Sequence, residues 1–167
     1  DPNTRNNSSL TVLMLASKNG NVPTIKTLLN NNANIHLKDK YGKTALMYAV
    51  INGNSDAVKF LLSNKAKIDD EDKSEWSPLL WAIKRKRVDI AKILIEAGAD
   101  IDHEDDEGTH IIHYAVFSGS YESLKLLIDS KVNLKAKDQY GLTALVYALK
   151  EKNTQMIQLI KDYGGKY

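Results

Sequence analysis

Small and apolar residues return along the whole chain at a constant spacing of 33 residues. Alanine occupies the same register five times, at Ala16, Ala49, Ala82, Ala115 and Ala148. A leucine or isoleucine stands three residues before each alanine, and another stands twelve residues after it. A fixed period of about 20 to 50 residues is typical of stacked supersecondary units, not of one closed globule.

Residues 39–71 show what one period contains. Turn residues open it at 39–42, and Thr44 then stands where a helix N-cap is expected. An apolar stripe over 46–50 predicts a short helix, and a second stripe over 57–62 predicts another. Neither helix can bury its stripe alone. The sequence therefore predicts an all-α array in which stacked neighbours stabilise each other and hairpin loops join the helix pairs.

A variant of the motif T-P-L-H-x-A follows each predicted hairpin from the second period onward. It reads TALMYA from Thr44, SPLLWA from Ser77, HIIHYA from His110 and TALVYA from Thr143. With its 33-residue period, the chain resembles the ankyrin-repeat family over nearly its whole length. This resemblance implies an ankyrin-repeat solenoid at 10–167, after a polar segment at 1–9, with units at about 6–38, 39–71, 72–104, 105–137 and 138–167.

Several turn positions that carry glycine in the family carry another residue here. Glu75 replaces the hairpin glycine, and Lys86 and Lys152 replace the glycine between the two helices. After the outer helices, the same substitution occurs at Asn32, Lys65 and Lys131. A left-handed backbone at these positions would cost on the order of 1 kcal/mol each. Such departures indicate a natural domain, not an idealised design.

Composition narrows the classes of function. The formal net charge of +2 is too small to indicate nucleic-acid or membrane binding by bulk electrostatics. The chain has no cysteine, which excludes disulfides and fits a reducing compartment, so we expect an intracellular and cytoplasmic protein. The longest apolar stretch, 45–51, is far shorter than the roughly 20 residues of a membrane span. The polar start suggests a linker or the edge of a longer protein.

The family resemblance also implies where a partner binds, because ankyrin domains use the concave surface formed by hairpin tips and inner helices. The residue before each repeated alanine should face this surface, and it is aromatic in every period except the first, which has Leu15. Tyr and Trp are enriched at interface hot spots. The predicted partner-binding residues are Tyr41, Tyr48, Trp76, Trp81, Lys84, Arg85, Tyr114, Phe117, Tyr140 and Tyr147. The alternative is that these rings pack among themselves and fill gaps between units.

Charge varies along the same surface. Lysine and arginine dominate its early part, including Lys84 and Arg85, whereas residues 104–107 make the fourth hairpin acidic. A basic stretch beside aromatic side chains favours an acidic or phosphorylated peptide. The run at 84–87 could also serve as a nuclear import signal, which makes the nucleus an alternative location.

Other constellations fail as chemical sites. His110 and His113 are spaced for one helix face, but His113 occupies the histidine of the family motif, a structural position. The acidic run at 102–108 places its glycine seventh, where a calcium loop needs it sixth. The chain shows no nucleophile–base pair and no phosphate-binding glycine loop. We therefore predict no catalytic residue, no cofactor and no metal site.

Three functions remain open. The leading interpretation is a monomeric protein-interaction module that binds a peptide or protein. The second is a regulatory ankyrin segment of a larger enzyme such as a palmitoyltransferase, because Trp81 resembles a tryptophan in the ankyrin domains of some of those enzymes. The third is a nucleotide or oligonucleotide sensor in which bases stack on Trp76, Trp81 and Tyr114. Binding of that third kind would weaken sharply with salt.

Overall fold

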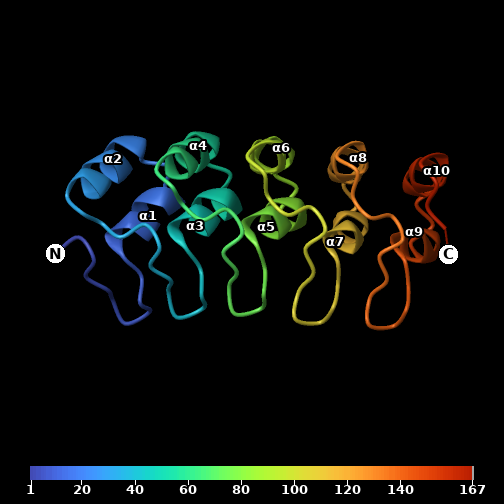
Figure 1. Ribbon diagram of the computed structural model, residues 1–167, viewed down its shortest axis with the longest axis horizontal. Coiled ribbons are helices and arrows are strands. Elements are labelled where there is room, and N and C mark those ends of the chain that lie inside the picture. The colour runs from blue at the N-terminus through green and yellow to red at the C-terminus, as the bar shows by residue number, and fades with distance from the viewer. Residues whose placement is uncertain (167) are drawn as a thin grey trace.

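The computed structural model describes residues 1–166, and within them ten helices form two parallel rows (Figure 1). The inner row consists of α1 (Val12–Lys18), α3 (Ala45–Asn52), α5 (Pro78–Lys84), α7 (Ile111–Ser118) and α9 (Ala144–Lys150). The outer row consists of α2 (Val22–Asn30), α4 (Ser55–Ser63), α6 (Val88–Glu96), α8 (Tyr121–Asp129) and α10 (Thr154–Asp162).

Each inner helix packs against the outer helix that follows it, and neighbouring pairs stack along both rows. The long loops between pairs all extend to the same side, beyond the inner row (Figure 1). Within residues 1–166 the only β-pairing is two isolated antiparallel bridges, Glu104 with His110 and Lys137 with Thr143. The predicted all-α solenoid is confirmed.

Polar caps start the inner helices where the sequence predicts them. The hydroxyl of Thr44 accepts from the Met47 N–H at 3.2 Å, and that of Ser77 accepts from the Leu80 N–H at the same distance. His110 makes no such bond. At the last inner helix the Thr143 hydroxyl donates instead to the Lys166 carbonyl at 3.0 Å. This bond holds Lys166 at the start of α9.

The periodic apolar residues form the core. All five repeated alanines are buried, because the inner helices of neighbouring pairs approach each other there. The leucines and isoleucines three residues before them are buried as well. The leucines and isoleucines that stand twelve positions after the alanines are also buried, except Leu28 in the first pair, which is partly exposed. The core is therefore one continuous strip between the two rows.

The non-glycine turn residues do adopt left-handed backbone. Glu75 in the hairpin has φ 56°, Lys86 between two helices has φ 54°, and Lys131 after an outer helix has φ 72°. The same holds at Asn32, Lys65 and Lys152. Each costs on the order of 1 kcal/mol relative to glycine. The turn geometry is therefore fixed by the stacking of the units and not by the local residue.

Neighbouring hairpins are joined through their backbones. The Lys73 N–H donates to the Tyr41 carbonyl at 2.9 Å, and the Lys40 N–H donates to the Ser8 carbonyl at 3.1 Å. Gly42 lies at this contact with φ 82°, and a Cβ there would stand 2.8 Å from the Lys73 nitrogen. Glycine avoids the cost of a left-handed backbone at this position, and its lack of a side chain permits the close approach. These contacts hold the hairpins side by side next to the inner helices.

Candidate binding surface

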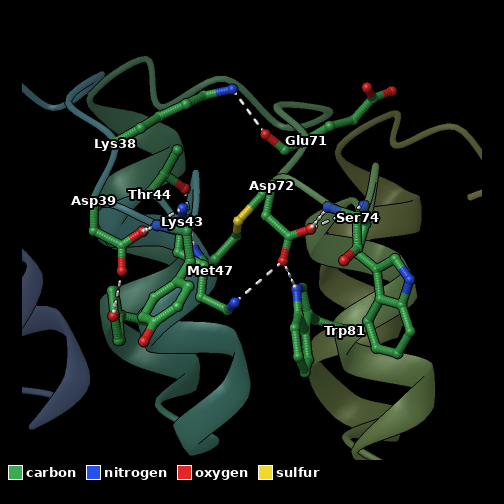
Figure 2. A network of polar contacts seen from close by, with 12 residues as sticks. Lys38, Asp39, Lys43, Thr44, Met47, Glu71, Asp72, Ser74 and Trp81 are labelled. Carbon is green, nitrogen blue, oxygen red and sulfur yellow. Dashed lines mark hydrogen bonds and ion pairs between the residues drawn. The ribbon is translucent and has the colours of Figure 1, made fainter. Parts of the chain in front are cut away.

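A buried carboxylate connects the third hairpin to α5. Oδ1 of Asp72 accepts from the backbone N–H of Ser74 at 3.0 Å and of Trp76 at 3.2 Å, which closes the turn. Oδ2 accepts from the indole N–H of Trp81 at 2.9 Å and lies 3.3 Å from the ammonium of Lys43 (Figure 2). The Trp81 ring therefore has a fixed orientation before any partner arrives.

The same arrangement recurs in every unit whose turn begins with aspartate. The ring donor always lies nine residues after the carboxylate, in the pairs Asp39–Tyr48 (2.7 Å), Asp105–Tyr114 (2.5 Å) and Asp138–Tyr147. In the first unit Asn6 closes the turn through its amide oxygen, and the residue nine positions later is Leu15, which has no group to donate. The carboxylate and the aromatic donor thus occur together or not at all.

These hydrogen bonds and burial shift the acidities of the groups involved. Burial, followed by the bond to the carboxylate, raises the pKa of Tyr48 and of Tyr114. The bond to Asp138, followed by burial, raises the pKa of Tyr147 to about 12. Burial alone would raise the pKa of Asp138, but the Tyr147 hydroxyl and two backbone N–H donors outweigh it, so the net pKa is lowered. At the Asp138–Tyr147 pair the fold therefore favours a neutral phenol and a charged carboxylate.

Five rings follow one another along the inner helices in the order Trp81, Trp76, Tyr114, Phe117 and Tyr147, a series we call the aromatic ladder. The successive centroid distances are 4.7, 5.1, 5.9 and 4.7 Å. The sequence predicts contact between Trp81, Tyr114 and Tyr147, with Trp76 and Phe117 widening the patch. In the structure Trp76 and Phe117 instead lie between the other rings and join them.

Exposure along the ladder is uneven. Tyr114 is only 8% exposed, so the prediction that it faces an open surface needs correction. Trp76 and Phe117 cover it from either side, because each makes an edge contact with its ring. Phe117 is 44% exposed, and Trp76, Trp81 and Tyr147 are half-buried. The ladder is thus packed against the core on one side and open on the other.

The remaining predicted aromatic residues lie outside the ladder. Tyr41 at the second hairpin is 54% exposed, and Tyr140 at the fifth is 73% exposed. The ammonium of Lys43 lies 5.4 Å from the Tyr41 centroid and 5.0 Å from that of Trp81, which links this tip to the ladder. Tyr48 is half-buried and anchored to its own hairpin. Tyr140 has no aromatic neighbour among the residues that the structure describes.

Two exposed cations border the start of the ladder. The Lys84 ammonium lies 5.3 Å from the Tyr114 centroid and 5.9 Å from that of Trp76. The Arg85 guanidinium lies 5.6 Å from the Trp81 centroid. Together Trp76, Trp81, Lys84 and Arg85 line an open cavity of about 370 Å³. These four predicted partner-binding residues thus line one common cavity.

The 33-residue period and the stacked pairs now have a match among known families. A family profile described as "Ankyrin repeats (3 copies)" matches residues 1–72 and 79–167 of the chain. The chain belongs to the ankyrin-repeat family. Ankyrin repeats are generally protein–protein interaction modules, and in this domain Tyr41, Phe117 and Tyr140 are exposed on the inner helices and hairpins. Comparison with curated proteins finds no match.

His110 and His113 lie at the start of α7. His113, in the repeat motif, is fully buried, and its Nε2 lies 3.1 Å from the Leu142 carbonyl of the next hairpin. Burial lowers the pKa of His113. His110 Nε2 lies 3.3 Å from a Glu104 carboxylate oxygen. Across residues 1–166, no group of three or more histidine, aspartate or glutamate side chains is arranged to hold a metal ion.

The sequence analysis missed the aspartate anchors. The signal was an aspartate with tyrosine or tryptophan nine residues later, four times at the ankyrin period and absent where Asn6 precedes Leu15. Nine residues is not a helical spacing, so the two side chains do not fall on one predicted helix face.

Among the described residues, no helix is both long and apolar enough to cross a bilayer.

Proposed function

We propose that this ankyrin domain binds a peptide or protein partner along a partly basic groove whose floor is the aromatic ladder. The observation that supports it most directly is the Asp72–Trp81 bond, together with its counterparts in the later units. Rings whose N–H and O–H groups are held by buried carboxylates need little further ordering when a partner binds. The open faces of Trp81 and Tyr147 remain available for contact.

The energetic argument concerns preorganisation. Immobilising a flexible side chain at an interface costs about 0.5–1.5 kcal/mol. Trp81 and Tyr147 are each held by a hydrogen bond and also packed against a neighbouring ring, so they avoid most of this cost. Well-packed tryptophan and tyrosine residues are the ones that carry most of the binding energy at hot spots. The ladder combines both properties over three consecutive units.

Two alternatives use the same surface. In a regulatory segment of a larger enzyme, the partner is another domain of the same chain, and the chemistry of binding is unchanged. In an oligonucleotide sensor, bases stack on Trp76 and Trp81 beside Lys84 and Arg85. That case predicts an affinity that falls steeply with salt, because many phosphates are neutralised, whereas a peptide that contacts the rings and two cations predicts a shallower dependence. Measuring the affinity at two salt concentrations therefore separates a nucleic-acid ligand from a protein partner.

The test is substitution at the ladder with a matched control. Wild-type protein and Trp81→Ala are used to capture partners from a cell extract, and the captured partner is purified and titrated calorimetrically. Trp81→Ala should weaken its binding by at least about 2 kcal/mol. Lys59→Ala and Lys92→Ala, both exposed on outer helices, should leave the affinity unchanged. A Trp81→Ala protein that binds normally but melts far lower would make the ladder core, not interface.

A further inference from the structure

The two indole N–H groups of the Trp76–Trp81 cavity differ, because only one of them already has an acceptor in the protein. The indole N–H of Trp81 is engaged by Asp72, so this ring offers only its face and edge. The indole N–H of Trp76 has no acceptor within hydrogen-bond reach anywhere in residues 1–166, although the ring is half-buried against Trp81 and Tyr114. An indole N–H can only donate, so Trp76 still has one hydrogen bond to offer to an acceptor.

The two cations of the cavity are also uncompensated. Lys43 stands nearby but is paired with Asp72 at 3.3 Å, so its charge is balanced. Lys84 and Arg85, by contrast, make no ion pair with any residue that the structure describes. Both are exposed and held over ring faces, where cation–π attraction keeps them close to the cavity. The local charge of the four lining residues is therefore +2, directed at whatever occupies the space.

The size and lining of the cavity limit its occupant further. A volume of about 370 Å³ is at the lower end of small-ligand sites, which are roughly 300–1,000 Å³. Two indole rings and two cations line it, and each cation lies over one of the rings. An apolar side chain with an anionic neighbour fits both parts at once. A bare anion would leave the indole faces uncovered, and a neutral apolar group would leave both cations and the Trp76 donor without a partner.

We propose that this cavity binds an acidic segment of a partner protein, with one aromatic or branched apolar side chain against Trp76 and Trp81. An adjacent aspartate or glutamate carboxylate then pairs with Lys84 and Arg85. This inference rests on the proposed function, because it names the chemistry of the partner at that same surface. It commits to a carboxylate as the anion.

Peptide selection tests the chemistry without knowledge of the natural partner. Random peptides of about twelve residues are selected on the immobilised wild-type domain, and the enriched sequences are synthesised. Trp76 and Trp81 are the only tryptophans of the chain, so intrinsic fluorescence reports occupancy of this cavity when the peptide lacks tryptophan. We expect enrichment of aspartate or glutamate next to an aromatic or branched apolar residue, with saturable fluorescence changes.

Matched variants then assign the contact. Replacing the peptide carboxylates by the corresponding amides should weaken binding to the wild type about tenfold, as expected for charge-assisted bonds. The double variant Lys84→Gln with Arg85→Gln should lose a similar factor and should no longer distinguish acid from amide. Lys59→Gln with Lys92→Gln removes the same charge from the outer helices and should bind like the wild type.

Each failure has its own meaning. Peptides that lose binding with Trp81→Ala but show equal affinity as acid and amide would overturn the acidic partner and leave the proposed function standing. Peptides indifferent to Trp81→Ala, or a selection that enriches nothing, would overturn both. A phosphoserine in place of the acidic residue that binds more than tenfold tighter would replace the carboxylate by a phosphate and so overturn this assignment.

Discussion

The Tyr114 hydroxyl donates a hydrogen bond of 2.5 Å to Oδ2 of Asp105, a carboxylate nine residues earlier in the fourth hairpin. Oδ1 of the same carboxylate accepts from the backbone N–H of Glu107 at 3.1 Å and of Thr109 at 2.9 Å. Both Asp105 and Tyr114 are buried. One side chain therefore holds the turn closed and attaches it to α7.

Removing this carboxylate should be costly. Asp105→Ala leaves two backbone N–H groups and one buried hydroxyl without their acceptor, and we expect the free energy of unfolding to fall by about 1–3 kcal/mol. Asp106→Ala, one residue further along the same loop, removes an exposed carboxylate and should change it by no more than about 0.5 kcal/mol. Urea denaturation measures both. Coincident midpoints for the two variants would show that the anchor is dispensable.

The close packing of the inner row gives a second prediction. Ala82 is fully buried where α5 stacks against its neighbours, so Ala82→Leu forces extra methyl groups into a filled space and should destabilise by roughly 1–3 kcal/mol. Ala97→Leu makes the same change at an exposed residue after α6 and serves as the control. If guanidinium denaturation finds the two variants equally stable, the assigned contact surface of α5 is wrong.

Alkaline pH should destabilise the domain through its anchored tyrosines. Their pKa values are raised above the ordinary value of 10, in Tyr147 to about 12. The folded state consequently binds more protons than the unfolded state above pH 10, so this stabilisation is complete below pH 10 and is lost as pH rises toward 12. Denaturation at a series of pH values measures the slope.

Two phenylalanine variants test whether the anchored tyrosines cause this loss of stability at alkaline pH. Tyr147→Phe removes one of the contributing hydroxyls and should flatten the dependence on pH. Tyr140→Phe removes an exposed hydroxyl outside the anchors and should retain the wild-type slope. Identical profiles for all three proteins would argue that the hydrogen bond to Asp138 does not influence the ionisation of Tyr147.

A fourth prediction concerns mild acid. Burial lowers the pKa of His113 below its ordinary value of 6.5, so the folded state binds fewer protons than the unfolded state as pH falls below that value. The associated stability is complete above pH 6.5 and is lost as pH decreases through the lower folded pKa. His113→Gln should remove this part of the dependence between pH 7 and 5, measured by urea denaturation. A variant profile parallel to that of the wild type would contradict the assignment.

Substitution of Trp81 by phenylalanine separates ring contact from hydrogen bonding. The indole N–H already binds Asp72, so a partner meets only the face of the ring. Trp81→Phe should therefore weaken partner binding by less than about 1 kcal/mol, far less than Trp81→Ala, while lowering stability through the lost bond to Asp72. Calorimetric titration and thermal unfolding of both variants provide the comparison. Equal losses of affinity would mean that the N–H is released to the partner.

The sequence was sufficient to predict the architecture, because in a stacked array each unit needs the same close contacts, turns and helix caps at the same positions. Five alanines in one register require five close contacts, and turn positions such as Lys86 adopt left-handed backbone because every other unit does. Caps such as Thr44 follow from backbone donors that any helix start leaves free. These features depend on spacing along the chain, which the sequence displays directly.

The details of the candidate surface could not be predicted in the same way. Whether Trp76 lies beside Trp81 or between it and Tyr114 depends on how the third hairpin packs against the inner helices, and no residue pattern encodes that packing. The burial of Tyr114 follows from the same placement. Side-chain order across units is set by tertiary packing, whereas periodicity reports only which residues share a register.

The constant spacing between turn carboxylate and ring donor has a consequence for how such a surface can change. An indole N–H at Trp81 satisfies Asp72 as a phenol O–H at Tyr48 satisfies Asp39, so the anchor accepts either ring. Tyrosine and tryptophan can therefore be exchanged at these positions while the hairpin keeps its shape. Successive units could acquire different rings one at a time, and partner preference could diverge through folded intermediates while the solenoid itself stays unaltered.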